Sequence, residues 1–149
     1  MKIICVGKIK EKYLKDAISE YLKRISKYTK LEIIEVNDVD LDKETTLKQE
    51  KEKIIKHISK KDYIITLEID GKEYTSLDFS KKLENIETHF SNITFIIGGS
   101  YGLDKELKDL ANEKISFSKM TFPHQLFRVF LLEQIYRAYK IKNNETYHK

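Results

Sequence analysis

A glycine-rich segment at residues 98–102 (Gly-Gly-Ser-Tyr-Gly) is the strongest local sign of chemistry in this 149-residue sequence. It directly follows the apolar run 93–97, which predicts a buried strand. A glycine turn at the carboxyl end of a parallel strand lets a ligand approach the backbone closely. The segment matches neither the dinucleotide fingerprint nor the phosphate-loop motif. A nucleotide-like ligand and a plain tight connection between strand and helix both remain open.

Two further segments carry side chains that could act on a substrate. Residues 116–125 (SFSKMTFPHQ) mix aromatic rings, hydroxyls and charge just before an expected helix start. Backbone N–H groups at a helix start are unpaired and can bind an acceptor. His124 could be a catalyst or only a local hydrogen-bonding residue, and the aromatic rings could equally belong to the core. The chain ends in Tyr147-His148-Lys149, a phenol, an imidazole and a cation, although chain ends are usually frayed.

Other kinds of site are not indicated by the residues. The four histidines, at positions 57, 89, 124 and 148, have no HxxxH or HExxH spacing, so we expect no metal site. No GxSxG nucleophile motif occurs. The single cysteine, Cys5, excludes an internal disulfide and is expected to be a small buried hydrophobe.

The elements that must position these segments alternate between strand and helix. Apolar runs predict strands at 2–6, 31–36, 63–67, 93–97 and 114–117, with Asp70-Gly71 as the turn after the third. Helical spacing predicts helices over about 11–27, 47–58, 77–90, 103–111 and 123–142. Such alternation implies an α/β fold, a mostly parallel sheet with helices on both faces. No linker or repeat divides the chain, so residues 1–149 are expected to form a single domain.

The predicted first and last helices show contrasting apolar patterns. Tyr13 starts an apolar face that continues through Ile25 in the first helix. The last helix is apolar on two sides, and a helix of this kind needs two partners. We therefore expect a homodimer, with a central helix buried within one chain as the alternative. One side carries Leu126, Phe127, Phe130, Leu131, Ile135, Ala138 and Tyr139, and the other Val129, Leu132 and Tyr136.

Charge is distributed unevenly along the chain, although the net charge is only +4. Residues 1–30 carry a balance of +6, residues 31–113 of −7 and residues 114–149 of +5. Two basic ends fit a polyanionic partner such as nucleic acid if folding brings them together, and ordinary solvated lysines are the alternative. No apolar run approaches the length of a membrane span and no secretory leader is recognisable, so we expect a cytoplasmic protein without a membrane partner.

Several of these motifs together resemble one known family from residue 1 to residue 149. They are Val6-Gly7-Lys8, Thr66-Leu67-Glu68, Ile97–Gly102, Phe117–Gln125, Glu133–Ala138 and Tyr147–Lys149. The chain is similar to the RlmH family of large-subunit rRNA (pseudouridine-N3) methyltransferases, which belongs to the SPOUT class. The resemblance implies a C-terminal trefoil knot, a homodimer and S-adenosylmethionine as cofactor. The implied cofactor residues are Leu67, Gly98, Phe117, Ser118, Lys119, Met120, Thr121 and Phe122.

The same resemblance implies the substrate, a pseudouridine of 23S rRNA that is methylated at N3 on the assembled ribosome. His148 is the implied proton acceptor and Tyr147 its catalytic neighbour, while Lys149, Arg137 and His124 are implied contacts to RNA. Two alternatives stay open beside this interpretation. One is a non-catalytic RNA- or ribosome-binding module with the same fold. The other is a nucleotide-binding enzyme of flavodoxin-like topology.

Overall fold

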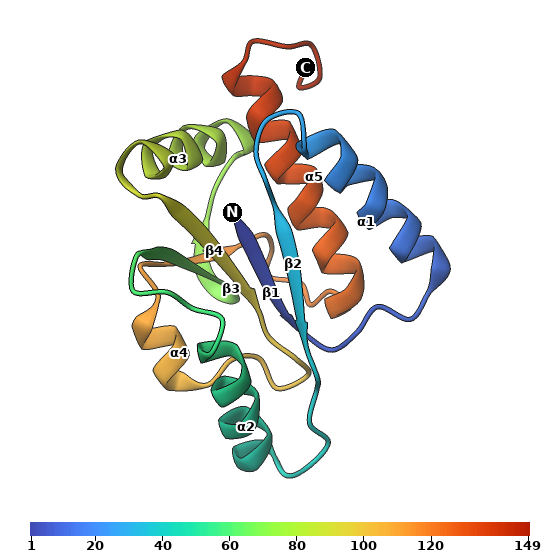
Figure 1. The fold of residues 1–149 in the computed structure, drawn as a ribbon, viewed down its shortest axis with the longest axis vertical. Helices are drawn as coiled ribbons and strands as arrows, with labels where there is room; N and C mark the ends of the chain where they lie inside the picture. Colours follow the sequence, from blue (N-terminus) through green and yellow to red (C-terminus); the bar gives the residue numbers. More distant parts are fainter.

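The computed structural model describes all of residues 1–149 as alternating strands and helices (Figure 1). These elements agree with the sequence prediction in number and order. The strands are β1 (Lys2–Val6), β2 (Glu32–Val36), β3 (Asp62–Glu73), β4 (Asn92–Ile97) and β5 (Glu113–Ser116). The helices are α1 (Lys12–Ile25), α2 (Lys43–Ile55), α3 (Ser76–His89), α4 (Lys105–Leu110) and α5 (His124–Lys142).

The five strands form one sheet in the order β2-β1-β4-β3-β5, and every neighbouring pair is parallel. Successive side chains of a strand point to opposite faces, so each central strand supplies two cores. On one face Cys5 and Phe95 pack with α1, α3 and α5. On the other face Ile4 and Ile96 pack with α2 and α4. The predicted α/β fold with helices on both faces is therefore confirmed, as is the burial of Cys5.

The strand order and the path of the last helix distinguish this sheet from other doubly wound folds. A flavodoxin-like sheet has the order 2-1-3-4-5, which this chain does not follow. From β5, at one edge, the chain returns as α5 to β1, where the Arg128 side chain donates to the Val6 carbonyl at 2.8 Å. This path agrees with the expected trefoil knot, which itself stays a prediction. No helix combines the length and the apolar character that crossing a membrane requires.

Strand β3 is longer than predicted and is interrupted by an excursion. Ile115 of β5 pairs with both Leu67 and Lys72, so residues 68–71 leave the ladder and re-enter it. The expected turn after the third strand at Asp70-Gly71 is therefore wrong, because β3 runs through these residues to Glu73 and only its pairing with β5 shifts register there. A Cβ at Gly71 would lie 2.5 Å from the carbonyl carbon of Ile115, so only glycine allows the two backbones to approach this closely.

Helix α5 lies between α1 and α3, which explains its two apolar sides (Figure 1). On the α1 side, the rings of Tyr136 and Tyr21 are 6.3 Å apart, and Leu132 is fully buried. On the α3 side, the Ser80 hydroxyl donates to the carbonyl of Ala138 at 2.7 Å. The alternative of a helix buried within one chain therefore accounts for the pattern, which by itself no longer argues for a dimer.

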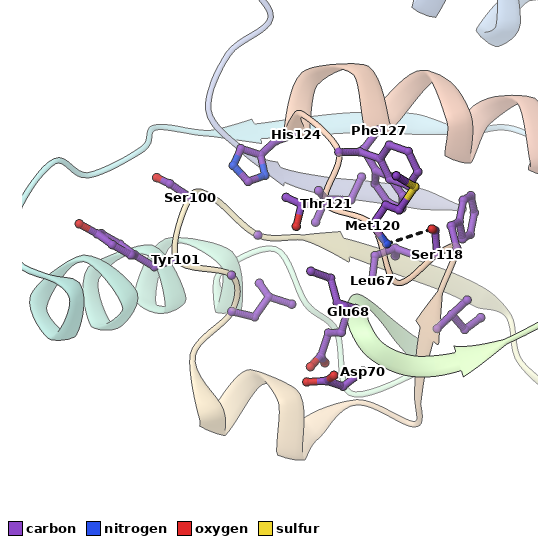
Figure 2. A pocket seen from close by; sticks show the side chains of 18 of the residues that line it. Leu67, Glu68, Asp70, Ser100, Tyr101, Ser118, Met120, Thr121, His124 and Phe127 are labelled. Atoms are coloured by element: carbon purple, nitrogen blue, oxygen red, sulfur yellow. Dashed lines mark hydrogen bonds between the residues drawn. The ribbon is translucent and has the colours of Figure 1, made fainter.

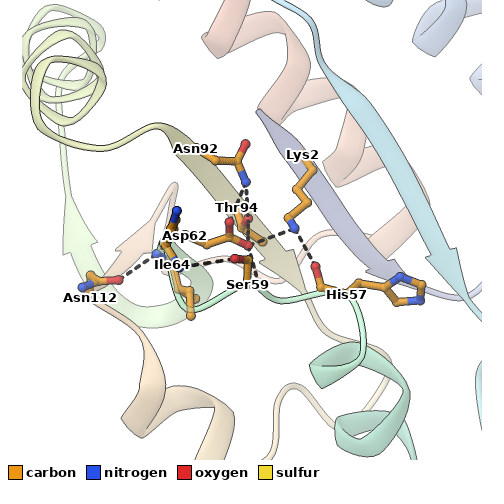
Figure 3. Close-up of polar contacts among 9 residues, drawn as sticks. Lys2, His57, Ser59, Asp62, Ile64, Asn92, Thr94 and Asn112 are labelled. Carbon is orange, nitrogen blue, oxygen red and sulfur yellow. Dashed lines mark hydrogen bonds and ion pairs between the residues drawn. The ribbon is translucent and has the colours of Figure 1, made fainter.

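A buried carboxylate joins three strands at the amino-terminal edge of the sheet (Figure 3). Asp62 at the start of β3 accepts hydrogen bonds from Asn92 at 2.8 Å and Thr94 at 2.9 Å, both on β4. It also accepts the Ser59 N–H at 3.0 Å and pairs with Lys2 of β1 at 2.9 Å. This network lies at the edge opposite to the glycine turn, because all strands are parallel and residues 98–102 follow the end of β4.

Candidate functional site

A cavity of about 410 Å³ opens at the carboxyl ends of β3, β4 and β5 (Figure 2). Its walls come from three segments that are distant in sequence, residues 67–70, residues 97–103 and residues 115–127, together with Lys108 of α4. The carboxyl edge is where parallel α/β sheets bind ligands, and the volume lies within the range of small-molecule sites. Apolar side chains make up about half of the lining residues, so the cavity suits a ligand with a flat apolar part and a few polar groups.

The glycine turn, residues 98–102, forms one wall of the cavity and is closed by an internal hydrogen bond. The Gly102 N–H donates to the carbonyl of Gly99 at 3.0 Å, and Gly102 has a φ of +78°. A Cβ at Gly98 would lie 2.4 Å from the carbonyl oxygen of Gly102. Gly98 is therefore needed because any side chain would collide with the backbone of its own turn. The side chains of Ser100 and Tyr101 are exposed at the cavity mouth.

The run 116–122 forms the opposite wall. The Met120 N–H donates to the Ser118 hydroxyl at 3.0 Å, and the Ser116 hydroxyl donates to the Ser118 carbonyl at 3.0 Å, which closes a compact loop. Phe117 packs against Phe127 of α5, with ring centres 5.1 Å apart. The expected cofactor residues that line the cavity are Leu67, Gly98, Phe117, Ser118, Met120, Thr121 and Phe122. The remaining one, Lys119, is exposed and lies outside the lining.

Two carboxylates of the β3 excursion were not predicted as site residues. Glu68 and Asp70 line the cavity on the side away from His124 (Figure 2). Glu68 accepts from the Thr66 hydroxyl at 2.7 Å and pairs with Lys108 at 3.1 Å, whereas Asp70 forms no ion pair and is exposed. The Asp70-Gly71 turn signal marked this segment in the sequence, but a turn signal does not indicate that the turn faces a cavity.

His124 is the first residue of α5 and lines the cavity together with Thr121 and Ser100 (Figure 2). Burial and the positive charge of Arg128 lower the pKa of His124 below its usual value of 6.5. The imidazole is therefore neutral at physiological pH, and it can donate one hydrogen bond and accept another. A neutral imidazole at the mouth can contact a base or a ribose without contributing a charge.

The C-terminal tail lies at the other end of α5. The Tyr147 hydroxyl donates to Glu133 at 3.1 Å, and Arg137 contacts Nδ1 of His148 at 3.2 Å. Arg137 also pairs with Glu133 at 2.6 Å. Thirteen residues separate Arg137 from His124, which is roughly 20 Å along the helix axis. Within one chain, the expected catalytic residues Tyr147 and His148, and Arg137 with them, are therefore apart from the cavity.

No group of three or more His, Cys, Asp or Glu side chains is arranged to hold a metal ion. The chemistry available at the cavity is that of a compact apolar pocket with two carboxylates on one side and a neutral imidazole on the other. Such a site suits the binding of a nucleoside-like molecule.

Comparisons with known proteins show the family to which this chain is similar. A family model described as a predicted SPOUT methyltransferase matches residues 1–148. A relative from Methanococcus maripaludis is 57% identical over 99% of this chain and 98% of its own length. The ribosomal RNA large subunit methyltransferase H of Clostridium botulinum strain Okra is 55% identical over 100% of this chain and 99% of its own. That of Ruminiclostridium cellulolyticum is 51% identical, over 99% and 98%.

The fold also resembles a solved structure described as a probable methylase family protein from Haemophilus influenzae. The match has a TM-score of 0.59 and covers 99% of this chain and 70% of that chain. The sequence identity is 12%, so this match concerns the fold alone.

Proposed function

This chain belongs to the SPOUT methyltransferase family, and we propose that it transfers a methyl group from S-adenosylmethionine to ribosomal RNA of the large subunit. The names of the full-length relatives support the rRNA substrate. The observation that carries the proposal is the cavity formed by the glycine turn, the β3 excursion and the run 115–127. A binding-only module would have no need for such a cavity.

The residues of the cavity fit S-adenosylmethionine. Apolar side chains such as Leu67, Ile97 and Phe117 would flank the adenine, and backbone groups of residues 117–122 would contact its polar edge. The Asp70 carboxylate is free to accept hydrogen bonds from ribose hydroxyls. Gly98 keeps the turn closed so that the wall stays in place. When bound, the cofactor supplies a methyl group carried on a positively charged sulfur.

We further propose that the methyl acceptor is N3 of a pseudouridine in 23S rRNA of the assembled ribosome, and that the protein acts in the cytoplasm. N3 is an imide nitrogen that carries a proton, so the site must align the nitrogen and offer a route for that proton. The basic ends of the chain fit the polyanionic substrate. His148 would receive the proton with Tyr147 beside it, and Lys149, Arg137 and His124 would contact the RNA.

These roles for the tail require a second copy of the chain. We propose a homodimer in which two α5 helices pair antiparallel, because this geometry brings the tail of one copy toward the cavity of the other. The outer face of α5 offers a suitable surface: Phe130 is 38% exposed and packs against Phe122, and the neighbouring Met120 is 73% exposed. The two ends of α5 that are apart in one chain would then form one composite site.

Calorimetry and a methyl-transfer assay test the proposed function. We expect binding of S-adenosylmethionine, no binding of FMN or NAD, and transfer of a labelled methyl group to ribosomes that lack the modification. Binding of the cofactor without transfer would instead support an RNA-binding module, and binding of FMN alone would contradict the proposal.

Replacing Gly98 by Ala tests the assignment of the cavity. The added methyl group would displace the turn, because its position lies 2.4 Å from the Gly102 carbonyl oxygen. We expect the affinity for S-adenosylmethionine to fall at least tenfold, about 1.4 kcal/mol, in a variant that still unfolds cooperatively. Ser91→Ala serves as the control, because it changes an exposed side chain just before β4, at the end of the strand opposite to the cavity. Unchanged affinity in a folded Gly98→Ala variant would remove the cavity as the cofactor site.

A further inference from the structure

The segment Gly7–Tyr13, which we call the basic loop, connects β1 to the first turn of α1 and is part of neither the cofactor cavity nor the tail. It reads Gly-Lys-Ile-Lys-Glu-Lys-Tyr. Lys8 and Lys10 are exposed and form no ion pair, whereas Ile9 between them is only 8% exposed. The alternation therefore directs two free lysines outward from a loop that is anchored by its apolar residue.

The backbone of the basic loop is fastened at several points. The Ile9 N–H donates to Glu35 of β2 at 3.1 Å, and the Lys10 N–H donates to the Gln125 side chain at 3.1 Å. Nη2 of Arg128 donates to the carbonyls of Val6 and Gly7, each at 2.8 Å. Arg128 has no exposed surface. A buried guanidinium is expensive to desolvate, and here it holds the start of the loop in one place.

These contacts place the basic loop at the mouth of the cavity. Gln125, which binds the loop, directly follows His124, which lines the cavity. Figure 1 shows the chain between β1 and α1 passing the amino-terminal end of α5. A large substrate that presents one nucleotide to the cavity would therefore meet the lysines of this loop.

An exposed aromatic ring completes the surface. Periodicity placed Tyr13 on the apolar face of α1, but the structure exposes 67% of it, while Leu14 beside it is buried. That prediction is wrong, because Leu14 is the buried residue of this first turn, and the ring contact of α1 with α5 is made two turns later by Tyr21. Lysines beside an exposed aromatic ring are the combination that binds single-stranded RNA, with phosphates on the cations and a base stacked on the ring.

We propose that the basic loop is an RNA-binding surface that holds the strand next to the nucleotide to be methylated, with Lys8 and Lys10 on phosphates and Tyr13 under a base. This inference rests on the proposed function, and it adds where the RNA lies on the protein. Arg128 is a positioning residue in this arrangement, because it acts through the loop and does not touch the RNA.

The test compares two double variants that remove the same charge. Lys8→Ala with Lys10→Ala should weaken binding to intact ribosomes about tenfold or more at physiological salt. It should also make the slope of log affinity against log KCl shallower by about 1.4 to 1.8, as expected for two lost phosphate contacts. Lys60→Ala with Lys61→Ala is the matched control, since both residues are exposed at the opposite edge of the sheet. The control should change the affinity less than twofold.

Tyr13 is tested separately, because the loss of base stacking and the loss of a charge change the salt dependence of binding differently. Tyr13→Ala should weaken ribosome binding about fivefold or more with an unchanged salt slope, and Tyr13→Phe should restore the affinity. Affinity for S-adenosylmethionine and the midpoint of thermal unfolding should stay at wild-type values in all of these variants.

Different results would contradict the RNA-binding role of the basic loop and the proposed function. If the loop variants bind ribosomes as well as the Lys60/Lys61 control does, the basic loop is an ordinary solvated surface and the inference is refuted. A wild-type protein that binds no ribosomes refutes it as well. A wild-type protein that binds ribosomes but transfers no methyl group contradicts the proposed function, and the comparison of affinities still decides the role of the loop.

Discussion

Two histidines are candidates for the reacting site, and their hydrogen bonds distinguish them. An arginine can only donate, so the contact between Arg137 and Nδ1 of His148 makes Nδ1 the acceptor. In the neutral form, the proton of His148 then lies on Nε2, which can donate to a carbonyl oxygen of the base. To accept a proton, His148 must leave Arg137. His124, whose pKa is lowered, already has a neutral ring at the cavity mouth.

The charge state of His124 gives a prediction about RNA binding. Because burial and Arg128 keep the imidazole neutral at pH 7.5, His124→Gln should leave the salt dependence of ribosome affinity unchanged while lowering the rate of methyl transfer. Lys149→Ala should instead make the slope shallower by about 0.7 to 0.9, because one phosphate contact is lost. Titration of ribosome binding at several KCl concentrations measures both. A shallower slope for His124→Gln would mean that this histidine binds RNA as a cation.

At the level of strands and helices, the amino-terminal and carboxyl ends of the parallel strands serve different purposes. The amino-terminal edge is held by the Asp62 network, in which the side-chain partners of the carboxylate come from the adjacent strand β4 and from β1 on the far side of β4. The carboxyl edge holds the cavity and is built of turns and excursions. Stability is thus provided at one edge, and the other can carry irregular backbone such as residues 68–71 and 98–102.

The Asp62 network predicts a pH dependence of stability. Burial alone would raise the pKa of the Asp62 carboxyl, but hydrogen bonds from Asn92, the Ser59 N–H, Lys2 and Thr94 lower the pKa below its usual value of 3.8. The unfolded chain therefore binds the proton at a higher pH than the folded chain, and the stabilisation that is present above pH 4 is lost as the pH falls through the lowered pKa. Urea unfolding at pH 7 and at pH 3 should show this loss in the wild type.

Substitution isolates the contribution of this carboxylate. Asp62→Ala should lower the free energy of unfolding by about 3–5 kcal/mol at pH 7, because it leaves Lys2 and Asn92 without their buried partner. The wild-type loss of stability between pH 7 and pH 3 should be smaller in this variant. Asp16→Ala, which breaks the exposed pair with Lys12, is the control and should change stability by less than about 1 kcal/mol. Equal effects of the two substitutions would contradict the role of the network.

For the whole molecule, the central question is how the two ends of α5 cooperate. The cavity adjoins the first turn of this helix, whereas the tail packs against Glu133, at the middle of the helix, and Arg137, one turn further on. Within one chain, Glu133 and Arg137 are about 14 Å and 20 Å from His124 along the helix axis, so the tail and the cavity do not meet. In an antiparallel pair of α5 helices, the two-fold symmetry would bring the tail of each copy toward the cavity of the other. Each dimer would then have two composite sites.

Mixed dimers test this arrangement directly. A Gly98→Ala chain keeps its tail but lacks a working cavity, and a chain without residues 147–149 keeps its cavity but lacks the tail. Each variant alone should be inactive, whereas a mixed dimer purified through two different tags should have about half of the wild-type activity, because one of its two sites is complete. A mixed dimer as inactive as both parents would show that the tail does not act across the dimer.

The sequence alone predicted the features that depend on residues close to one another along the chain. The apolar runs and helical spacings gave the strands and helices in order, because a period of about two or 3.6 residues reflects which side of an element is buried. The glycine turn and the run 117–122 were recognised because glycine, hydroxyl and aromatic residues occur there in a short, specific order. Both segments lie on the cavity.

Only the tertiary structure decided which segments meet. The second apolar side of α5 contacts α1, and the Tyr13 ring is exposed although its spacing fits the apolar face. The β3 excursion faces the cavity, Arg128 fastens the basic loop, and the tail packs on the second half of α5, away from the pocket. Each of these facts depends on a contact between residues far apart in the sequence. Local periodicity describes one element at a time, so it shows that a side chain needs a partner and does not show which partner it finds.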